Sequence, residues 1–485
     1  MAPDDSQRSI APSRRSLREA ATAPSPQRPA SARPASGRRA SARSTTARPQ
    51  ALTWVSAETV TARPVAWPDG GAAVVEPPLV ARWPRRSVWR APLLVPLMTA
   101  LVMATIYAVA MLMWPLHAVT PTIAAQEVTP VAAPAAVMPW PAQGSAAVSV
   151  AGISGSLASS PDAVTMASIT KVIASLVILE EMPLALGEQG PSFSFSRQTA
   201  GDYLSRDESA LRVPVGGSLT QYQLLEGTLI GSAGNYIDRL ADALYPNDAV
   251  FARAAMQWLD AHGITGITIA DPSGIGVRNT ATPEDLLAVA RLAMAHPVIA
   301  EIVGKTSVDL PGAGLVENTN RLLADPGVVG IKTGMLNDAY NVLLAKDIVV
   351  GETTVRVYAD VLHQSDPDTR SAIARQLFAA LEEQLQPTTT VAQGTVVGTV
   401  TTEWGESVDV VAAADADLIL WNASPATAVA TLQLGEARVA GADVGTVAVT
   451  GPLGSAAVAA ELAADIEPPS PWWRLTHPLE LLGLR

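Results

Sequence analysis

Two short motifs in this 485-residue chain combine residue types that can carry out acyl transfer. The first runs from Ser168 to Lys171 with the spacing S-x-x-K, and the second is Lys332-Thr333-Gly334. Only four of the 33 basic residues are lysines, and two of them lie in these motifs. An arginine is always protonated, whereas a lysine can accept a proton when burial and a neighbouring cation lower its pKa. The spacing therefore predicts a nucleophile, Ser168, with Lys171 as its base.

The helix and the strand expected around these motifs would position their side chains for catalysis. Residues three apart share one face of a helix, so Lys171 Nζ is expected to reach Ser168 Oγ. Backbone N–H groups at a helix start can stabilise an oxyanion. The apolar residues 328–331 predict a strand leading into Lys332, and a glycine after it lets a ligand approach the backbone. Taken singly, the motifs also fit an ordinary helix start and an ordinary turn, so the interpretation depends on finding both.

Composition excludes several other kinds of chemistry. The chain has no cysteine, which rules out disulfides, thiolate catalysis and cysteine metal sites. The five histidines are scattered without ligand spacing, so we expect neither a metal nor another cofactor. Residues 1–90 carry a net charge of +9 in a chain whose total is −12. This basic segment shows no sign of a fold, so we expect a disordered tail and no nucleic-acid partner.

An uncharged stretch from residue 91 to residue 116 follows the basic segment. It is long enough to span a bilayer, and four arginines directly precede it. The sequence therefore predicts a single transmembrane helix at 91–114, with residues 1–90 in the cytoplasm and everything after the helix outside the cell membrane. A cleaved signal peptide is the competing interpretation.

The remaining chain divides by composition into four parts. Residues 115–138 are rich in Pro and Ala and predict an extended linker, which fully stretched would reach about 80 Å. Residues 139–386 have strands at both ends and helices between, which predicts an α/β unit with one mixed sheet. Residues 391–466 alternate short strands with turn residues and predict a small all-β domain. The Trp- and Leu-rich tail, 467–485, is expected to pack against one of these domains, with a position on a membrane surface as the alternative.

Residues 139–386 resemble the serine D-alanyl-D-alanine carboxypeptidases among the low-molecular-mass penicillin-binding proteins. Residues 391–466 resemble, more weakly, the β-domain that follows the catalytic unit in many members. The resemblance implies a penicillin-binding, β-lactamase-like transpeptidase fold. It rests on several motifs in the family's order: Met166–Val172, Ala270–Ile275 with Asn279–Thr282, Asn318–Leu323, and Gly330–Gly334.

The same resemblance implies a reaction and a set of roles. The enzyme would remove the terminal D-alanine from peptidoglycan stem peptides through an acyl-enzyme, without a cofactor, and β-lactams would inhibit it. The implied catalytic residues are Ser168, Lys171 and Ser232, and the implied substrate-binding residues are Lys332, Thr333, Gly334, Met335 and Asn235. The backbone N–H groups of Ser168 and Met335 would form the oxyanion hole.

One motif departs from the family pattern. The family has S-x-N in the middle of the unit, whereas this chain reads Ser232-Ala233-Gly234-Asn235. Flanking leucines favour Ser232 as the motif serine, which puts Gly234 in the place of the asparagine. The other register keeps Asn235 and loses the serine. Asn235 could also turn into the site if Gly234 adopted an unusual backbone conformation.

This departure, together with Leu336 where the family usually has threonine, leaves three functions open. The first is an active carboxypeptidase. The second is a catalytically impaired, membrane-anchored protein that keeps the pocket for binding the cell wall. The third is a β-lactamase, although no convincing deacylating glutamate lies between the second and third motifs.

Overall fold

The computed structural model describes residues 91–198 and 209–484. The basic segment 1–90 lies outside the described residues. The first element is helix α1 (Ala91–Met113), and Leu93–Met113 is long and apolar enough to cross a membrane. Within α1 the hydroxyls of Thr99 and Thr105 donate to backbone carbonyls one turn earlier, so they need no outside partner. The predicted apolar helix is therefore present, ending one residue before the expected boundary.

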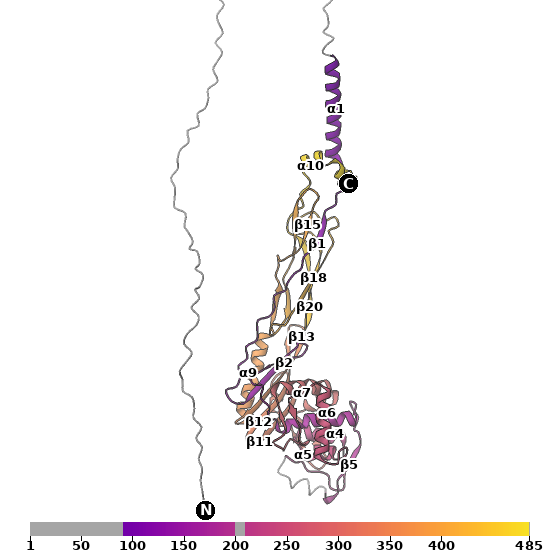
Figure 1. Ribbon diagram of the computed structural model, residues 1–485. Coiled ribbons are helices and arrows are strands. Elements are labelled where there is room, and N and C mark those ends of the chain that lie inside the picture. Colours follow the sequence, from indigo (N-terminus) through magenta and orange to yellow (C-terminus); the bar gives the residue numbers. More distant parts are fainter. Residues whose placement is uncertain (1–90, 199–208, 485) are drawn as a thin grey trace, which may run out of the picture. The chain divides into compact units, whose positions relative to one another are not determined.

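A five-stranded sheet forms the centre of the α/β unit (Figure 1). Its order is β11-β12-β13-β2-β3, and every pairing is antiparallel. The α/β architecture is as expected, but a sheet mixing parallel and antiparallel strands is not found. Each long strand is joined to the next by a tight hairpin, which allows only antiparallel pairing. The strands are β11 (Val328–Leu336), β12 (Ala339–Val350), β13 (Thr353–Gln364), β2 (Ser145–Val150) and β3 (Leu157–Ala158).

The hairpin between β11 and β12 places the second motif at the sheet edge. Asn337 and Asp338 connect the strands and both have positive φ, at 52° and 59°. That conformation at two successive residues matches the twist of the flanking strands, and Asn and Asp tolerate it. Strand β11 has a sheet neighbour on one side only, so Lys332, Thr333 and Gly334 lie on an edge strand.

Helices cover the two faces of the sheet. Helix α2 is buried along Thr170–Leu179 and lies at the centre of the larger core, as expected for a helix that is apolar on most sides. Helix α9 covers the opposite face with a stripe that includes Ala374, Leu377 and Leu381. The helices of the unit are α2 (Thr170–Glu181), α4 (Gln221–Leu229), α5 (Gly234–Ala241), α6 (Asp248–Ala261), α7 (Pro283–Ala295), α8 (Pro297–Val303) and α9 (Pro367–Gln384).

Short elements complete the α/β unit. A three-stranded ribbon pairs the residues before the first motif with the segment that follows helix α6. Two further two-stranded antiparallel sheets belong to the unit. These elements are β4 (Val164–Thr165), β8 (Thr280–Ala281), β7 (Ile267–Thr268), β5 (Ser192–Ser194), β6 (Ser218–Thr220), β9 (Ser307–Leu310), β10 (Gly314–Glu317) and the 3₁₀ helices η1 (Ala167–Ile169) and η2 (Arg321–Ala324).

The segment after helix α9 is all-β, as predicted. A six-stranded antiparallel sheet has the order β1-β15-β16-β20-β19-β18, and β14 pairs with β17 beside it. Their apolar side chains form a core of their own. We call residues 391–466 the β-domain. β14 (Pro387–Val391) leads into the β-domain, whose own strands are β15 (Val396–Thr401), β16 (Ser407–Ala412), β17 (Ala416–Ile419), β18 (Thr427–Leu432), β19 (Asp443–Gly451) and β20 (Gly454–Leu462).

The segment predicted as a linker is extended, but it is not a free spacer. Strand β1 (Thr122–Ala125) pairs with β15 over four residues. Val128 and Ala133 are buried in the core of the β-domain, and Met138 is buried in the core beside α9. Composition alone could not reveal this, because a four-residue strand depends on a partner nearly 280 residues away for its stability. The extended segment is therefore held by the β-domain and by the core beside α9.

The tail forms two short helices, α10 (Pro471–Thr476) and α11 (Pro478–Leu481). As expected, it packs against other parts of the chain. Its partners are the end of helix α1 and Trp404 of the β-domain.

Candidate active site

The first motif lies where η1 runs into helix α2. Ser168 is in η1, and Lys171 is in the first turn of α2. Lys171 Nζ is 3.0 Å from Ser168 Oγ, so the contact expected from the i, i+3 spacing is present. Lys171 is buried, and its ammonium also donates a short hydrogen bond to the backbone carbonyl of Ser273. This lysine is held between the serine hydroxyl and a second acceptor.

The Ser273 carbonyl that accepts this hydrogen bond lies in a loop held by its own internal hydrogen bonds. The Asp271 carboxylate accepts hydrogen bonds from Ser273 Oγ and from the backbone N–H groups of residues 274, 275 and 276. The side-chain amide of Asn279 donates a further hydrogen bond to the same carboxylate, and the Asn279 backbone carbonyl accepts a hydrogen bond from Met166 N. The loop is thereby tied to the residues that precede the nucleophile. Sequence reasoning noted this stretch only as part of the resemblance and did not place Ser273 in the site.

Two glycines allow separate segments to close on the nucleophile. Gly274 has φ of +79°, and a Cβ there would clash with the backbone carbonyl of Ala167. A Cβ on Gly334 would lie 2.8 Å from Met166 O and 3.2 Å from Ser168 N. Ala167 itself has φ of +51°, a left-handed conformation that a residue with a side chain seldom adopts. The structure thus brings Gly334 of the second motif against the backbone of Ser168.

Lys332 is the second buried lysine of the site. Its Nζ donates to Thr333 O at 3.1 Å, while Thr333 Oγ1 donates to Thr319 Oγ1 at 2.7 Å. Burial, and then the positive charges of Lys171 and Arg370, hold the pKa of Lys332 well below its usual value. A bound carboxylate would supply the negative charge that this buried cation lacks.

Arg370 is a further site residue that sequence reasoning missed. It lies at the start of α9, is buried, and donates through Nη1 to Asn341 O at 3.1 Å. Its charge acts on Lys332, as described above. The available signal was a basic residue one turn into a helix whose other inward residues are apolar.

The middle motif is arranged differently from the expectation. Ser232 is buried in the turn between α4 and α5 and has φ of +62°. Gly234 begins helix α5 with an ordinary backbone conformation, and its N–H donates to Ser209 O. The unusual dihedrals therefore fall on the serine and not on the glycine.

The Asn235 side chain is engaged elsewhere. Its Oδ1 accepts from Leu211 N at 3.1 Å, and its Nδ2 donates to Leu211 O at 2.8 Å. The residue is buried, and both ends of the amide are used by one neighbour. The Asn235 amide therefore holds the backbone of Leu211 and does not contact Ser168 or Lys171. Met335 follows the second motif with its side chain 56% exposed.

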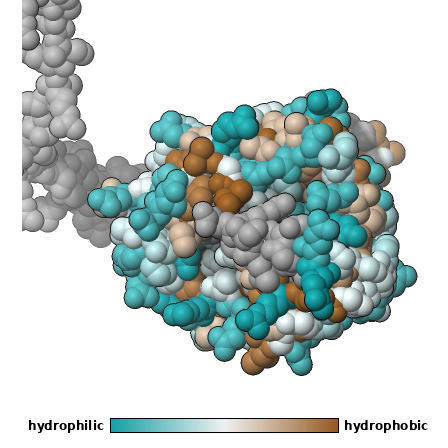
Figure 2. Space-filling view, turned by 90° about the horizontal axis from the view of Figure 1, so that it is seen from below, coloured by the Kyte–Doolittle hydropathy of each residue, from teal (hydrophilic) through white to brown (hydrophobic). Residues whose placement is uncertain are grey.

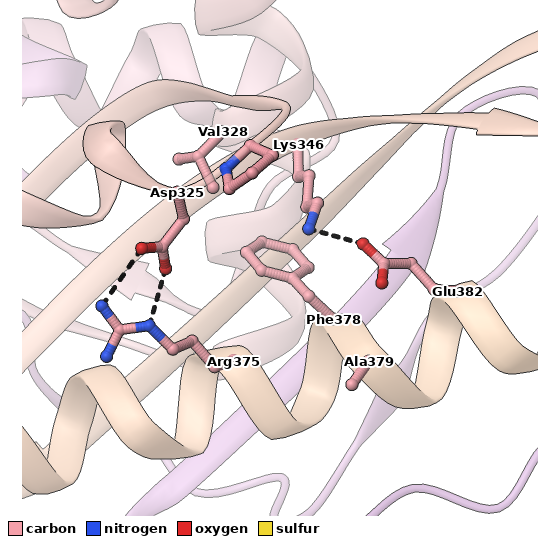
Figure 3. A pocket seen from close by; sticks show the side chains of 8 residues that line it. Asp325, Val328, Lys346, Arg375, Phe378, Ala379 and Glu382 are labelled. Atoms are coloured by element: carbon pink, nitrogen blue, oxygen red, sulfur yellow. Dashed lines mark hydrogen bonds and ion pairs between the residues drawn. The ribbon is translucent and has the colours of Figure 1, made fainter.

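A concavity lies away from these motifs, between β11, β12 and α9 (Figure 3). It encloses about 280 Å³. Its charged side chains neutralise one another: Arg375 pairs with Asp325 at 2.7 Å, and Lys346 pairs with Glu382 at 2.5 Å. Lys346 also lies over the ring of Phe378. These contacts join the sheet to α9, so we assign this concavity a structural role. Across the described ranges 91–198 and 209–484, no three His, Asp or Glu side chains form a group suited to a metal ion.

Comparison with known proteins agrees with the motif geometry. Residues 146–365 match the family model for D-alanyl-D-alanine carboxypeptidases, peptidase S11. This part of the chain is therefore similar to that carboxypeptidase family. A curated relative, D-alanyl-D-alanine carboxypeptidase DacB2 of Mycobacterium tuberculosis, is 31% identical over 184 residues. The match covers 36% of this chain and 58% of the length of that relative.

Solved structures of carboxypeptidases and penicillin-binding proteins are also similar. A peptidoglycan synthesis regulatory factor from Streptococcus pneumoniae is 20% identical, with a TM-score of 0.47, over 66% of this chain and 98% of the other. Penicillin-binding protein 5 from Haemophilus influenzae is 16% identical, with a TM-score of 0.45, over 68% and 99%. A D-alanyl-D-alanine carboxypeptidase from Mycobacterium tuberculosis is 24% identical, with a TM-score of 0.43, over 52% and 95%.

Proposed function

We propose that this protein is a membrane-anchored serine D-alanyl-D-alanine carboxypeptidase that trims peptidoglycan stem peptides. The observation that carries the proposal is the 3.0 Å contact between Lys171 Nζ and Ser168 Oγ, at the start of a buried helix. The edge strand with Lys332, Thr333 and Gly334 closes on the same serine and supports the assignment. The match of residues 146–365 to the family model also supports this reaction.

In the proposed reaction, Lys171 in its neutral form takes the proton from Ser168 Oγ. The oxygen attacks the carbonyl of the penultimate D-alanine, and the backbone N–H groups of Ser168 and Met335 stabilise the oxyanion. Ser232 relays a proton to the nitrogen of the leaving D-alanine as the peptide bond breaks. Water then hydrolyses the ester, which releases the shortened peptide and restores Ser168.

Lys332 and Thr333 are the proposed partners of the substrate's terminal carboxylate. Lys332 is buried, and this burial, followed by the positive charges of Lys171 and Arg370, holds its pKa well below the usual value. A C-terminal carboxylate would both neutralise it and favour its protonated form. This selects substrates that end in a free carboxylate, as a stem peptide does.

The Gly234 substitution favours a slow enzyme, and an impaired wall-binding protein is the second candidate. Asn235 already binds the backbone of Leu211, so it supplies no amide to the reacting groups. The family's asparagine at the Gly234 position contacts the base lysine and the substrate amide. Without it, Ser232 is the one polar side chain that this motif offers.

Anchoring by helix α1 is part of the proposal. The uncharged span 93–113 supports a membrane helix, and the arginines before it favour a cytoplasmic N-terminus. The α/β unit and the β-domain would then lie outside the cell, where stem peptides are found.

The test uses the full chain in lipid nanodiscs with a pentapeptide ending in D-Ala-D-Ala. Release of D-alanine by the wild type, and none by Ser168→Ala, is the expected result. Labelling by fluorescent penicillin without any D-alanine release would favour the impaired binding protein. If Ser168→Ala released D-alanine at the wild-type rate, the assigned nucleophile would be wrong.

A further inference from the structure

Thr319 lies beside the candidate site and has no part in the proposed reaction. It belongs to the loop between strand β10 and the 3₁₀ helix η2. Thr319 is exposed, whereas Thr333, whose hydroxyl it contacts, is 7% exposed. The two Oγ1 atoms are 2.7 Å apart. Thr319 is therefore the solvent-facing member of a hydroxyl pair whose buried member is the proposed partner of the substrate carboxylate.

The backbone of this loop is held by contacts that do not involve the Thr319 hydroxyl. The N–H of Thr319 donates to Ile230 O, at the end of helix α4, at 3.1 Å. Asn318 Nδ2 donates to Lys305 O at 2.8 Å, and Asn318 N donates to Thr306 O at 2.8 Å. Removing the Thr319 hydroxyl should therefore leave the loop in place.

The two hydroxyls have only one hydrogen each. A threonine hydroxyl can donate one hydrogen bond and can accept two. In the free protein, Thr333 Oγ1 donates its hydrogen to Thr319 Oγ1. A carboxylate can only accept, so Thr333 has to turn its hydrogen away from Thr319 in order to bind one. The contact between the two hydroxyls is then lost unless Thr319 turns its own hydrogen toward Thr333.

We propose that Thr319 is a positioning residue for Thr333, and that the hydrogen bond between the two hydroxyls reverses its direction when a substrate carboxylate binds. Thr319 then donates to Thr333 Oγ1, and Thr333 donates to the carboxylate. Each hydrogen stays on its own oxygen, so no bond is broken. The inference deepens the proposed function and rests on the binding of the substrate carboxylate by Thr333.

The reversed arrangement favours a charged acceptor. Hydrogen bonds to an ionised acceptor are stronger than those between neutral groups. A hydroxyl that accepts one hydrogen bond is polarised and becomes a better donor in the next. The pair of Thr319 and Thr333 should therefore select peptides that end in a free carboxylate over peptides that end in an amide.

The hydroxyl contact is not needed to hold the edge strand. Strand β11 is paired with β12 from Val328 to Leu336. The face of the α/β unit in Figure 2 is largely hydrophilic, with its hydrophobic residues in separate patches. Individual polar groups give specificity where a ligand is bound. A pair of hydroxyls at the candidate site fits that purpose better than a purely structural one.

The test measures peptide binding in a Ser168→Ala background, where the proposed acylation cannot occur. The full chain in lipid nanodiscs is titrated with a peptide ending in D-Ala-D-Ala and with its C-terminal amide, and binding is followed by ligand-observed NMR. Thr319→Val should weaken binding of the free acid roughly three- to tenfold, the effect of losing one hydrogen bond. It should leave binding of the amide unchanged. Thr319→Ser keeps the hydroxyl and should bind both peptides as the parent does.

Two further variants separate a positioning role from a structural one. Thr306→Val is the matched control, because Thr306 holds the same loop through its backbone carbonyl. It should bind both peptides as the parent does. Thr333→Val removes the hydroxyl through which Thr319 acts, so adding Thr319→Val to it should cause no further loss.

Three results would overturn the inference. The first is equal weakening of acid and amide by Thr319→Val, which would show a general structural role. The second is unchanged binding of the acid in that variant. The third is a parent protein that does not prefer the acid over the amide. The proposed function is tested separately, by D-alanine release with Ser168 intact. The predicted dependence on Thr319 without any release would keep the inference and favour the impaired binding protein.

Discussion

The two sides of the candidate site use their buried polar groups for different purposes. Around Ser168, the polar groups converge on the reacting atoms: Lys171 contacts the serine, and Asp271 fixes the loop that presents Ser273 O to that lysine. Around Ser232, the amide of Asn235 instead binds the neighbouring backbone at Leu211. On the Ser168 side the buried polar groups thus hold the candidate reacting atoms, whereas on the Ser232 side the Asn235 amide holds the backbone.

The largest expected effect belongs to the nucleophile side. Ser168→Ala should abolish covalent labelling by penicillin, because it removes the hydroxyl that is hydrogen-bonded to Lys171 Nζ and that is the proposed nucleophile. Ser175→Ala is the control, since that buried serine lies one turn further along α2 and bonds only the Lys171 carbonyl. Labelling should persist in the control and can be followed by gel fluorescence. Labelling of Ser168→Ala at the wild-type level would show that Ser168 is not the nucleophile.

The proposed binding of the substrate carboxylate by Lys332 predicts that kcat/KM depends on pH. Carboxylate binding needs the protonated amine, and the pKa of Lys332 is lowered by burial and by two nearby cations. The protonated fraction is lost as pH rises through this lowered value, so kcat/KM should fall on the alkaline side, below the usual lysine pKa of about 10.4.

Lys332→Arg tests the origin of that alkaline decline. An arginine stays protonated, so the decline should disappear or move to higher pH even if the overall rate is lower. The measurement is the pH profile of D-alanine release at low substrate concentration. An unchanged profile would assign the decline to another group.

On the Ser232 side, restoring the missing amide should raise activity. Gly234 has an ordinary helical backbone, so Gly234→Asn is conformationally allowed. One hydrogen bond to a buried polar site contributes about 1–3 kcal/mol, which corresponds to a gain of roughly 10- to 100-fold in the rate of D-alanine release. No gain would mean that an amide at position 234 does not contribute to the reaction.

Asn235→Ala is expected to have the smallest effect on catalysis. It removes two hydrogen bonds to the Leu211 backbone and should cost about 1–3 kcal/mol in local stability. Faster amide hydrogen exchange at Leu211, with D-alanine release close to wild type, is the predicted result. A loss of activity larger than the gain in Gly234→Asn would instead assign Asn235 to the substrate.

Local patterns predicted the parts of the site that depend on local geometry. The S-x-x-K spacing predicted the contact between Lys171 and Ser168 because both residues lie on one helical turn. The apolar run before Lys332 predicted strand β11. Neither pattern could identify Ser273, whose contribution is a backbone carbonyl that any residue type possesses. Arg370 was equally hidden, since its influence on Lys332 depends on packing between α9 and the sheet.

The linker shows the same limit at the level of the fold. Proline and alanine correctly predict an extended chain, and composition contains nothing about what lies beside it. Strand β1 forms because β15 offers a free edge, and that edge is specified by residues 396–401. Non-local pairing of this kind is decided by tertiary context rather than by propensity.

The pairing of β1 with β15 also bears on how this protein responds to being cut. The chain is joined to α1 covalently through residues 114–121, while the tail holds the same helix end without a covalent bond. A single nick between β1 and β2 would leave β1 bound to β15 and the tail bound to α1. We expect the two fragments to stay together, so that shedding the enzymatic portion from a cell surface would require a second cleavage or the release of both contacts.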